Sequence, residues 1–239
     1  KMNTLNFYTY QPDILGNGYQ QLTLNFADDY DGKVVATLVR KKAAQATKKA
    51  VLYVHGFTDY FFQKEMAEQF NQHGYDFYAL DLRKYGRSKL PHQTLYYVRD
   101  LREYDAEISK SLEIISQENH NQVLLAGHST GGLITTLYAA HYPDHRLVKA
   151  LWANSPFYDF FKSIIEKKVG IPLLSEFGKR FPNAKFPSGL NPWYVPSLHK
   201  KFHGEWEFNL EWKPESMPFV QLCFVHAIHE AQKEIHKGI

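Results

Sequence analysis

Residues 122–133, Gln-Val-Leu-Leu-Ala-Gly-His-Ser-Thr-Gly-Gly-Leu, constrain the fold of this chain more than any other stretch. The apolar run 123–126 is typical of a strand buried on both faces of a parallel sheet. It ends at Gly127, and a helical pattern begins after Gly131, with Ser129 midway between these glycines. The motif alone would also fit a flexible loop. The strand before it and the helix after it favour a sharp turn, in which only glycine tolerates the crowding two positions from the serine.

A second motif supports this interpretation of Ser129 as a nucleophile. The apolar strand 50–54 ends in His55-Gly56-Phe57-Thr58-Asp59-Tyr60. A serine that attacks an acyl carbonyl creates an oxyanion, which needs two N–H donors aimed at it. The backbone N–H of Thr130, the residue after the serine, is expected to be one donor. The second is expected from the loop at residues 55–57, which follows the strand 50–54.

Strand and helix patterns alternate along most of the first 156 residues. Such alternation predicts an α/β fold with a doubly wound, mostly parallel sheet, and the first two strands form an antiparallel hairpin at its edge. The predicted strands are residues 19–26, 33–40, 50–54, 75–82, 123–126 and 149–153, and the predicted helices are residues 61–73, 95–115 and 133–141.

With these motifs, the chain resembles the α/β-hydrolase fold, in the branch that includes monoglyceride lipases and serine aminopeptidase-like hydrolases. The resemblance extends from about residue 20 to the C-terminus. It implies that the N–H of Phe57 is the second oxyanion donor and that His55 orients the loop around Gly56. It also implies that His128, beside the serine, points away from it and is not the base.

From Phe157 the sequence changes character, and prolines punctuate a segment rich in Phe, Trp and Tyr. We expect three regions: a hydrolase core at 1–156, an inserted cap at 157–215, and a last helix within 216–239 that returns to the core. Ordinary surface loops are the alternative, although a loop of this length without a function is uncommon. Aromatic residues of the cap are expected either to contact substrate or to fix the cap to the core; these are Trp193, Tyr194, Phe202, Trp206, Phe208 and Trp212.

The acid and the base of a catalytic triad are not evident. In this fold the order is serine, then acid, then histidine, and both partners follow later strands. The chain stops at Ile239, where the acid-bearing strand would begin, and Asp159 is only a minor alternative acid. The expectation is therefore a truncated chain of weak or no activity. Without the later strands, the edge at residues 149–153 would be exposed and available for self-association.

Composition excludes several other classes of protein. The net charge is only +3 and the basic residues are scattered, which argues against a nucleic-acid partner. The single cysteine, Cys223, and the polar N-terminus favour a cytoplasmic protein, and no apolar run approaches the roughly 20 residues of a membrane span. Neither metal-ligand spacing nor a dinucleotide fingerprint implies a cofactor.

The prediction is a serine hydrolase that cleaves a small lipophilic carboxylic ester through an acyl-enzyme at Ser129. Two alternatives stay open. The chain could cleave amides, as an amidase or aminopeptidase does, because the residues do not separate ester from amide cleavage. It could also be a catalytically dead binding protein that retains the elbow and the cap.

Overall fold

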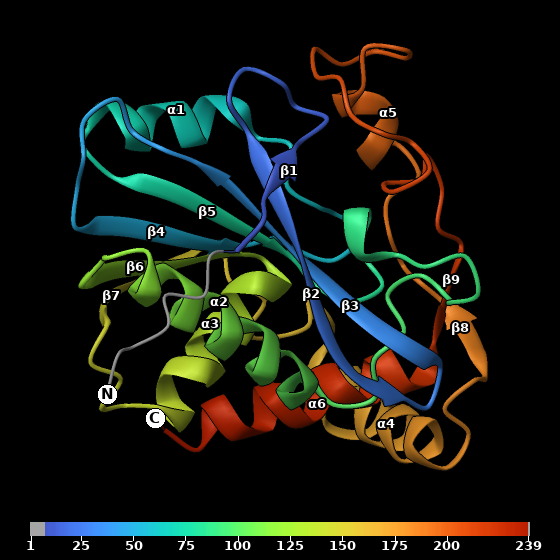
Figure 1. Cartoon of the computed structure of the whole chain (residues 1–239). Helices are drawn as coiled ribbons and strands as arrows, with labels where there is room; N and C mark the ends of the chain where they lie inside the picture. The colour runs from blue at the N-terminus through green and yellow to red at the C-terminus, as the bar shows by residue number, and fades with distance from the viewer. Residues whose placement is uncertain (1–7, 239) are drawn as a thin grey trace.

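The computed structural model describes residues 8–238, and its centre is a seven-stranded sheet in the order β1-β2-β3-β5-β4-β6-β7 (Figure 1). The pairs that join β5, β4, β6 and β7 are parallel, whereas β1, β2, β3 and β5 pair antiparallel. The predicted edge hairpin is confirmed as β2 and β3. The strands are β1 (Gln11–Pro12), β2 (Gln20–Asp29), β3 (Gly32–Lys41), β4 (Lys49–Val54), β5 (Asp76–Asp81), β6 (Gln122–His128) and β7 (Val148–Asn154).

Helices cover both faces of this sheet (Figure 1). Helix α1 (Lys64–Gln72) lies on one face, and α2 (Asp105–Gln117), α3 (Thr130–His141) and α6 (Leu222–His236) lie on the other. Successive side chains of a strand point to opposite faces. In β4, Val51 and Tyr53 accordingly join the core beneath α1, while Leu52 and Val54 join the larger core beneath α2, α3 and α6. Apolar residues on both faces explain why β4 and β6 read as continuous hydrophobic runs.

The predicted helix at residues 95–115 begins too early. Tyr96 has φ 64°, a left-handed conformation that an α-helix cannot include. The side chain of Asp100 accepts a hydrogen bond from the N–H of Arg102, and with Glu103 it forms a capping box. A 3₁₀ turn, η2 (Leu101–Tyr104), follows this cap and leads into α2. A second 3₁₀ turn, η1 (Gly86–Ser88), follows β5.

The segment after β7 folds against the end of the sheet and the start of α6. It contains a π-helical turn, η3 (Glu166–Gly170), which runs directly into α4 (Ile171–Arg180), then β8 (Lys185–Pro187) and α5 (Tyr194–Leu198). Strand β9 (Phe219–Gln221) pairs antiparallel with β8. The last helix predicted within residues 216–239 is α6, and it begins only at Leu222, because the three residues before it extend to pair with β8.

Strand β7 is the last strand of the sheet. Its side chains Leu151 and Trp152 are 39% and 40% exposed, whereas the neighbouring strand β6 is mostly buried. Within residues 8–238 the sheet thus has an exposed, partly apolar edge, as the sequence predicted. Across that same range, no helix combines the length and the apolarity that crossing a membrane requires.

Candidate active site

Two loops meet where β4 and β6 end side by side. The strands are parallel, and Val54 of β4 pairs with Gly127 of β6. In the strand order, β5 lies next to β4 and β7 lies next to β6, so the connections from β4 and from β6 run in opposite directions along the sheet. Such a switch point opens a crevice at the carboxyl ends of the strands. A Cβ added to Gly56 would lie 3.2 Å from the Cβ of Ser129. A side chain at position 56 would therefore press on the Ser129 turn more tightly than most side-chain contacts do.

Ser129 stands in the turn between β6 and α3, as the sequence predicted. Its backbone has φ 55° and ψ −119°, a region that residues with a side chain rarely occupy. Serine at this position of a helix usually caps it, but the Ser129 side chain makes no capping hydrogen bond. The turn is held by its backbone: the N–H of Ser129 donates to Asn154 O at 3.0 Å, and its carbonyl accepts from Phe157 N–H at 3.0 Å. The hydroxyl therefore has no structural task in α3.

The two glycines that flank this turn are sterically required. A Cβ on Gly127 would lie 2.3 Å from the carbonyl oxygen of Gly131. A Cβ on Gly131 would lie 2.3 Å from the carbonyl oxygens of both Val54 and His55. The geometry agrees with the reasoning that only glycine fits two positions before and after the serine.

One predicted oxyanion donor, Thr130, belongs to the Ser129 turn, and the other, Phe57, belongs to the loop that follows β4. Thr130 is the first residue of α3, so its N–H is among the amides that have no acceptor inside the helix. The His55 ring is fully buried; its Nε2 accepts from Leu82 N–H at 3.1 Å, and its Nδ1 lies 2.9 Å from Gly56 O. Since Nε2 accepts, the hydrogen is on Nδ1 and is donated to that carbonyl. In a trans peptide the carbonyl and the next N–H point in opposite directions, so His55 turns the N–H of Phe57 away from itself.

His128 and Asp159 occupy different surroundings. The half-buried His128 ring lies close to Gly56, since a Cβ added to Gly56 would be 3.4 Å from Nδ1 of His128. Burial lowers the pKa of His128. Asp159 is exposed and forms an ion pair with Lys167, whose hydrogen bond lowers the pKa of the carboxyl. The structure thus gives Asp159 a surface partner, and no hydrogen bond links it to Ser129 within residues 8–238.

Several histidines that follow Ser129 in sequence have partners elsewhere. His141 contacts Glu234 at 2.8 Å and Asp105 at 3.3 Å. The buried His199 ring bonds to Phe208 O at 2.9 Å, and Nδ1 of His226 lies 2.9 Å from the hydroxyl of Ser175. Each of these three rings therefore has a partner other than Ser129.

Sequence reasoning missed a buried ion pair beside the proposed oxyanion loop. Lys213 is 1% exposed, and its Nζ lies 3.1 Å from Asp59 Oδ1 and 3.3 Å from Thr58 O. Thr58 has φ 53°, which is unusual for a β-branched residue. The lysine therefore holds a strained turn that directly follows Phe57. The pair joins residues 154 positions apart, so no local pattern could have revealed it.

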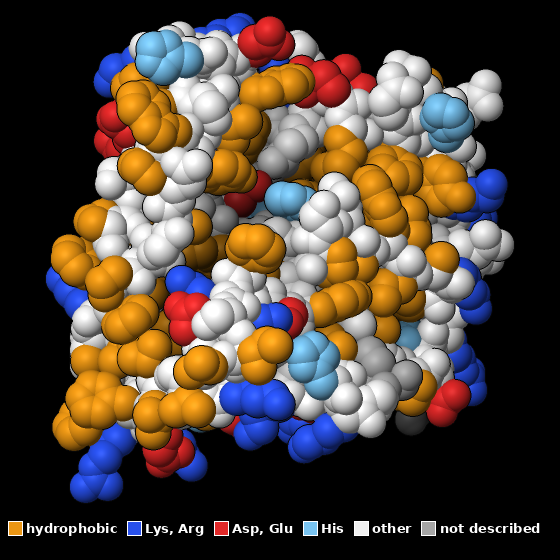
Figure 2. Space-filling view, turned by 180° about the vertical axis from the view of Figure 1, so that it is seen from behind, with side chains coloured by type: hydrophobic (Ala, Val, Ile, Leu, Met, Phe, Trp, Pro, Cys, Tyr) orange, Lys and Arg blue, Asp and Glu red, His pale blue; other side chains and the backbone are white. Residues whose placement is uncertain are grey.

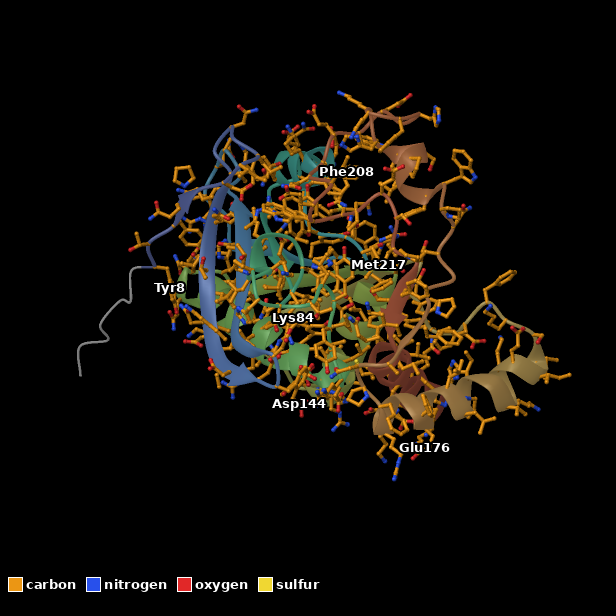
Figure 3. The ribbon with its side chains drawn as sticks, turned by 90° about the vertical axis from the view of Figure 1, so that its right-hand side faces the viewer. Tyr8, Lys84, Asp144, Glu176, Phe208 and Met217 are labelled. Atoms are coloured by element: carbon orange, nitrogen blue, oxygen red, sulfur yellow. The ribbon has the colours of Figure 1, made fainter. Side chains whose placement is uncertain are left out.

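The aromatic residues of residues 157–215 divide into two groups. Phe208 is buried and packs against Phe62 with ring centroids 4.8 Å apart, and Trp212 packs edge-on against Tyr60 at 5.2 Å. Trp193 is instead 65% exposed. Figure 3 shows Phe208 on the part of this segment that approaches α1. The buried rings of the first group fix the segment to the core, which is one of the two roles expected for its aromatic residues.

A cavity of about 260 Å³ lies between the turn at Thr58 and this segment. A larger cavity of about 1030 Å³ lies between α3, β7 and α6, away from the Ser129 turn. In the described part of the chain, no cluster of three or more His, Cys, Asp or Glu side chains could hold a metal ion. The wall of the smaller cavity is mostly apolar and includes Leu190, Pro192, Tyr194, Val195, Met217 and Pro218.

Comparison with known proteins agrees with this geometry. A family model described as serine aminopeptidase, S33, matches residues 45–202. Epoxide hydrolase 4 of Mus musculus is 29% identical over 147 residues, which are 61% of this chain and 39% of that protein. Probable lysophospholipase L2 of Haemophilus influenzae is 30% identical over 137 residues, covering 56% and 43%. The chain spans about two fifths of the length of these curated relatives.

Solved structures resemble the fold over a larger share of their length. A soluble variant of monoglyceride lipase from Saccharomyces cerevisiae superposes with a TM-score of 0.63 at 18% identity, covering 90% of this chain and 69% of that one. Monoacylglycerol lipase of Paleococcus ferrophilus gives 0.61 at 20% identity, covering 91% and 72%. The predicted fold class and resemblance are confirmed: the chain has the α/β-hydrolase fold and belongs to the serine aminopeptidase S33 family.

Proposed function

We propose that this chain carries the nucleophile and the oxyanion site of a serine hydrolase that cleaves a carboxylic ester. The observation that carries the proposal is the state of Ser129. It stands at the start of α3 with φ 55° and makes no capping hydrogen bond, and Gly56 approaches its Cβ. A strained backbone that presents an otherwise unused hydroxyl is typical of a nucleophile elbow.

The chemistry follows the acyl-enzyme route. The Ser129 oxygen attacks the ester carbonyl carbon, a base takes the hydroxyl proton, and the N–H groups of Thr130 and Phe57 stabilise the oxyanion. The alcohol leaves with a proton, and water then hydrolyses the acyl-serine. The neutral, buried His55 acts only through the loop, because burial lowers its pKa and its two ring nitrogens are already engaged.

We expect slow turnover by the 239-residue chain alone. No histidine among residues 8–238 forms a hydrogen bond with the Ser129 side chain, and an unassisted serine hydroxyl is a poor nucleophile. Hydrolases that lack members of the triad retain roughly 10³–10⁴-fold catalysis over water through the oxyanion site and substrate binding.

The proposed substrate is a small lipophilic ester beneath residues 157–215, which we propose act as a cap. The mostly apolar cavity beside Thr58 supports this class, as do relatives whose names refer to lysophospholipase and monoglyceride lipase. Cleavage of an amide is the second candidate, favoured by the description of the family as serine aminopeptidases. Both reactions share the same attack on an acyl carbon.

Chemical rescue of the base tests the proposal. Hydrolysis of p-nitrophenyl acetate would be measured with increasing concentrations of imidazole, which can accept the serine proton. We expect imidazole to accelerate the reaction of the native chain and to leave Ser129→Ala at the rate without protein. Ser155→Ala is the matched control, since Ser155 is another serine that follows a strand end and has φ 46°.

Mass spectrometry of the acylated protein identifies the reacting residue. The acetyl group should appear on the peptide that contains Ser129 and be absent from Ser129→Ala. Equal rescue in Ser129→Ala, or acetylation at Ser155, would show that the elbow is not the nucleophile. p-Nitroanilide substrates, assayed in the same way, distinguish amide from ester cleavage.

A further inference from the structure

Residues 161–181, which span η3, α4 and the few residues on either side of them, carry an unusual line of exposed apolar residues. Every fourth residue from 161 to 181 is large and apolar, and each is 47–102% exposed. Figure 3 shows α4 extending away from the sheet, with Glu176 labelled on it. We call this set the exposed ladder; it consists of Phe161, Ile165, Val169, Leu173, Phe177 and Phe181.

The ladder cannot turn inward, because the opposite side of α4 is already packed. Residues four apart lie on one face of a helix. Ile171, Ser175 and Gly178 form the buried face of α4. A Cβ on Gly178 would lie 2.3 Å from Leu222 O, so the helix is seated closely on the start of α6. The exposure of the ladder thus follows from how α4 packs.

Basic residues accompany the ladder. Residues 161–181 contain five basic and two acidic side chains. Lys162 lies 3.8 Å from Glu166, and Lys167 pairs with Asp159. Lys168, Lys179 and Arg180 form no ion pair within residues 8–238. Figure 2, which views the molecule from behind, shows hydrophobic and basic side chains side by side at its lower left, the corner where α4 lies.

An apolar line flanked by positive charge fits the surface of an anionic lipid bilayer. Helices that lie in a membrane interface place Phe, Leu and Trp among the acyl chains and Lys and Arg among the headgroups. A second copy of the chain would fit less well, because a symmetric contact through this face would bring like charges together. We propose that the exposed ladder binds anionic phospholipid membranes and seats the chain on them.

This surface is distinct from the proposed catalytic turn. None of its residues takes part in the contacts of Ser129 or lines the cavity beside Thr58. The proposal therefore stands independently of whether Ser129 is a nucleophile. If both hold, the hydrolase would work at the surface of its lipid substrate.

Sedimentation with lipid vesicles tests the proposal with the whole 239-residue chain. The vesicles would contain phosphatidylcholine alone or phosphatidylcholine mixed with phosphatidylglycerol, and the bound fraction would be measured. We expect binding that rises with phosphatidylglycerol content and falls with added salt. The triple variant Ile165→Ser/Leu173→Ser/Phe177→Ser should bind at least about tenfold less well to the mixed vesicles.

Two further variants separate the possible causes. Lys168→Glu/Lys179→Glu should lose the preference for phosphatidylglycerol while circular dichroism stays unchanged. Ile14→Ser is the matched control, since Ile14 is 64% exposed and lies in the loop between β1 and β2 (Figure 1). It should bind vesicles as the native chain does. Equal binding by the triple variant would overturn the proposal, and so would a dimer in light scattering that the triple variant abolishes.

Discussion

Replacing Lys213 by methionine should destabilise the protein strongly. Lys213 is 1% exposed and Asp59 is 5% exposed, with Nζ and Oδ1 3.1 Å apart. At an effective dielectric constant of about 20, Coulomb's law gives about 5 kcal/mol for two unit charges at that distance. Removing one partner of a buried pair costs about 3–5 kcal/mol, because the other charge stays buried without compensation. We therefore expect a loss of about 3–5 kcal/mol in the free energy of unfolding.

Methionine isolates the effect of the charge. Its flexible thioether can fill the space against the rings of Tyr194 and Phe208, which lie 4.9 and 5.7 Å from Nζ. Asp59→Asn removes the stranded charge, so the double variant Asp59→Asn/Lys213→Met should recover much of the lost stability. A cycle of these variants should give a coupling free energy of at least about 2 kcal/mol.

Urea unfolding followed by circular dichroism measures each free energy. Lys110→Met is the matched control, because Lys110 lies 2.9 Å from Glu113 on the surface, with both side chains at least 39% exposed. Exposed pairs contribute about 0–1 kcal/mol, so this variant should resemble the native chain. If Lys213→Met unfolded within 1 kcal/mol of the native chain, or if the two changes were additive, the ion pair would not stabilise the loop.

Three further outcomes follow from the same contacts. Gly131→Ala should lower the midpoint of urea unfolding and the soluble yield, because its Cβ would overlap the backbone oxygens of Val54 and His55 at the end of β4. Burial lowers the pKa of His55, so the unfolded chain takes up a proton near pH 6.5 while the folded protein resists protonation. The free energy of unfolding should therefore fall below that pH, by up to about 1.4 kcal/mol per pH unit. In urea unfolding from pH 8 to 5, His55→Gln should show a shallower decrease than the native chain. The exposed edge β7 should promote self-association that Leu151→Lys/Trp152→Lys reverses, and a monomeric native chain in light scattering would refute it.

The strand ends of the site could be predicted from the sequence because their constraints are local. The two glycines around Ser129 and the glycine at position 56 stand where neighbouring segments of the chain approach closely. Each can be recognised in the sequence as a glycine at a fixed spacing within its motif. The apolar runs of β4 and β6 record burial on both faces. Such signals lie within a few residues of the feature that they specify, so they can be read without the rest of the chain.

The helix that precedes the elbow strand shows where periodicity misleads. Apolar residues recur at helical spacing from residue 95, yet Tyr96 takes a left-handed conformation and its hydroxyl donates to Trp212 O at 3.1 Å. That contact spans 116 positions. The Tyr96 side chain is buried because of contacts with distant residues. Its position in the apolar pattern therefore led to the prediction of helix where none forms. The capping box at Asp100 was the better signal for the helix start.

The segment 157–215 could not be predicted in detail because nonlocal contacts determine its shape. Strand β8 pairs with β9, which brings residues on either side of the 188–218 stretch together. Lys213 then ties the end of that stretch to the turn at Thr58, and Asn209 N–H donates to the hydroxyl of Tyr60 at 2.7 Å. The contacts of Lys213 and Asn209 fix the segment relative to residues 58–60, which directly follow Phe57, the proposed oxyanion donor. The position of the proposed cap and the conformation of the proposed oxyanion loop thus depend on the same hydrogen bonds, so a change in either one should alter the other.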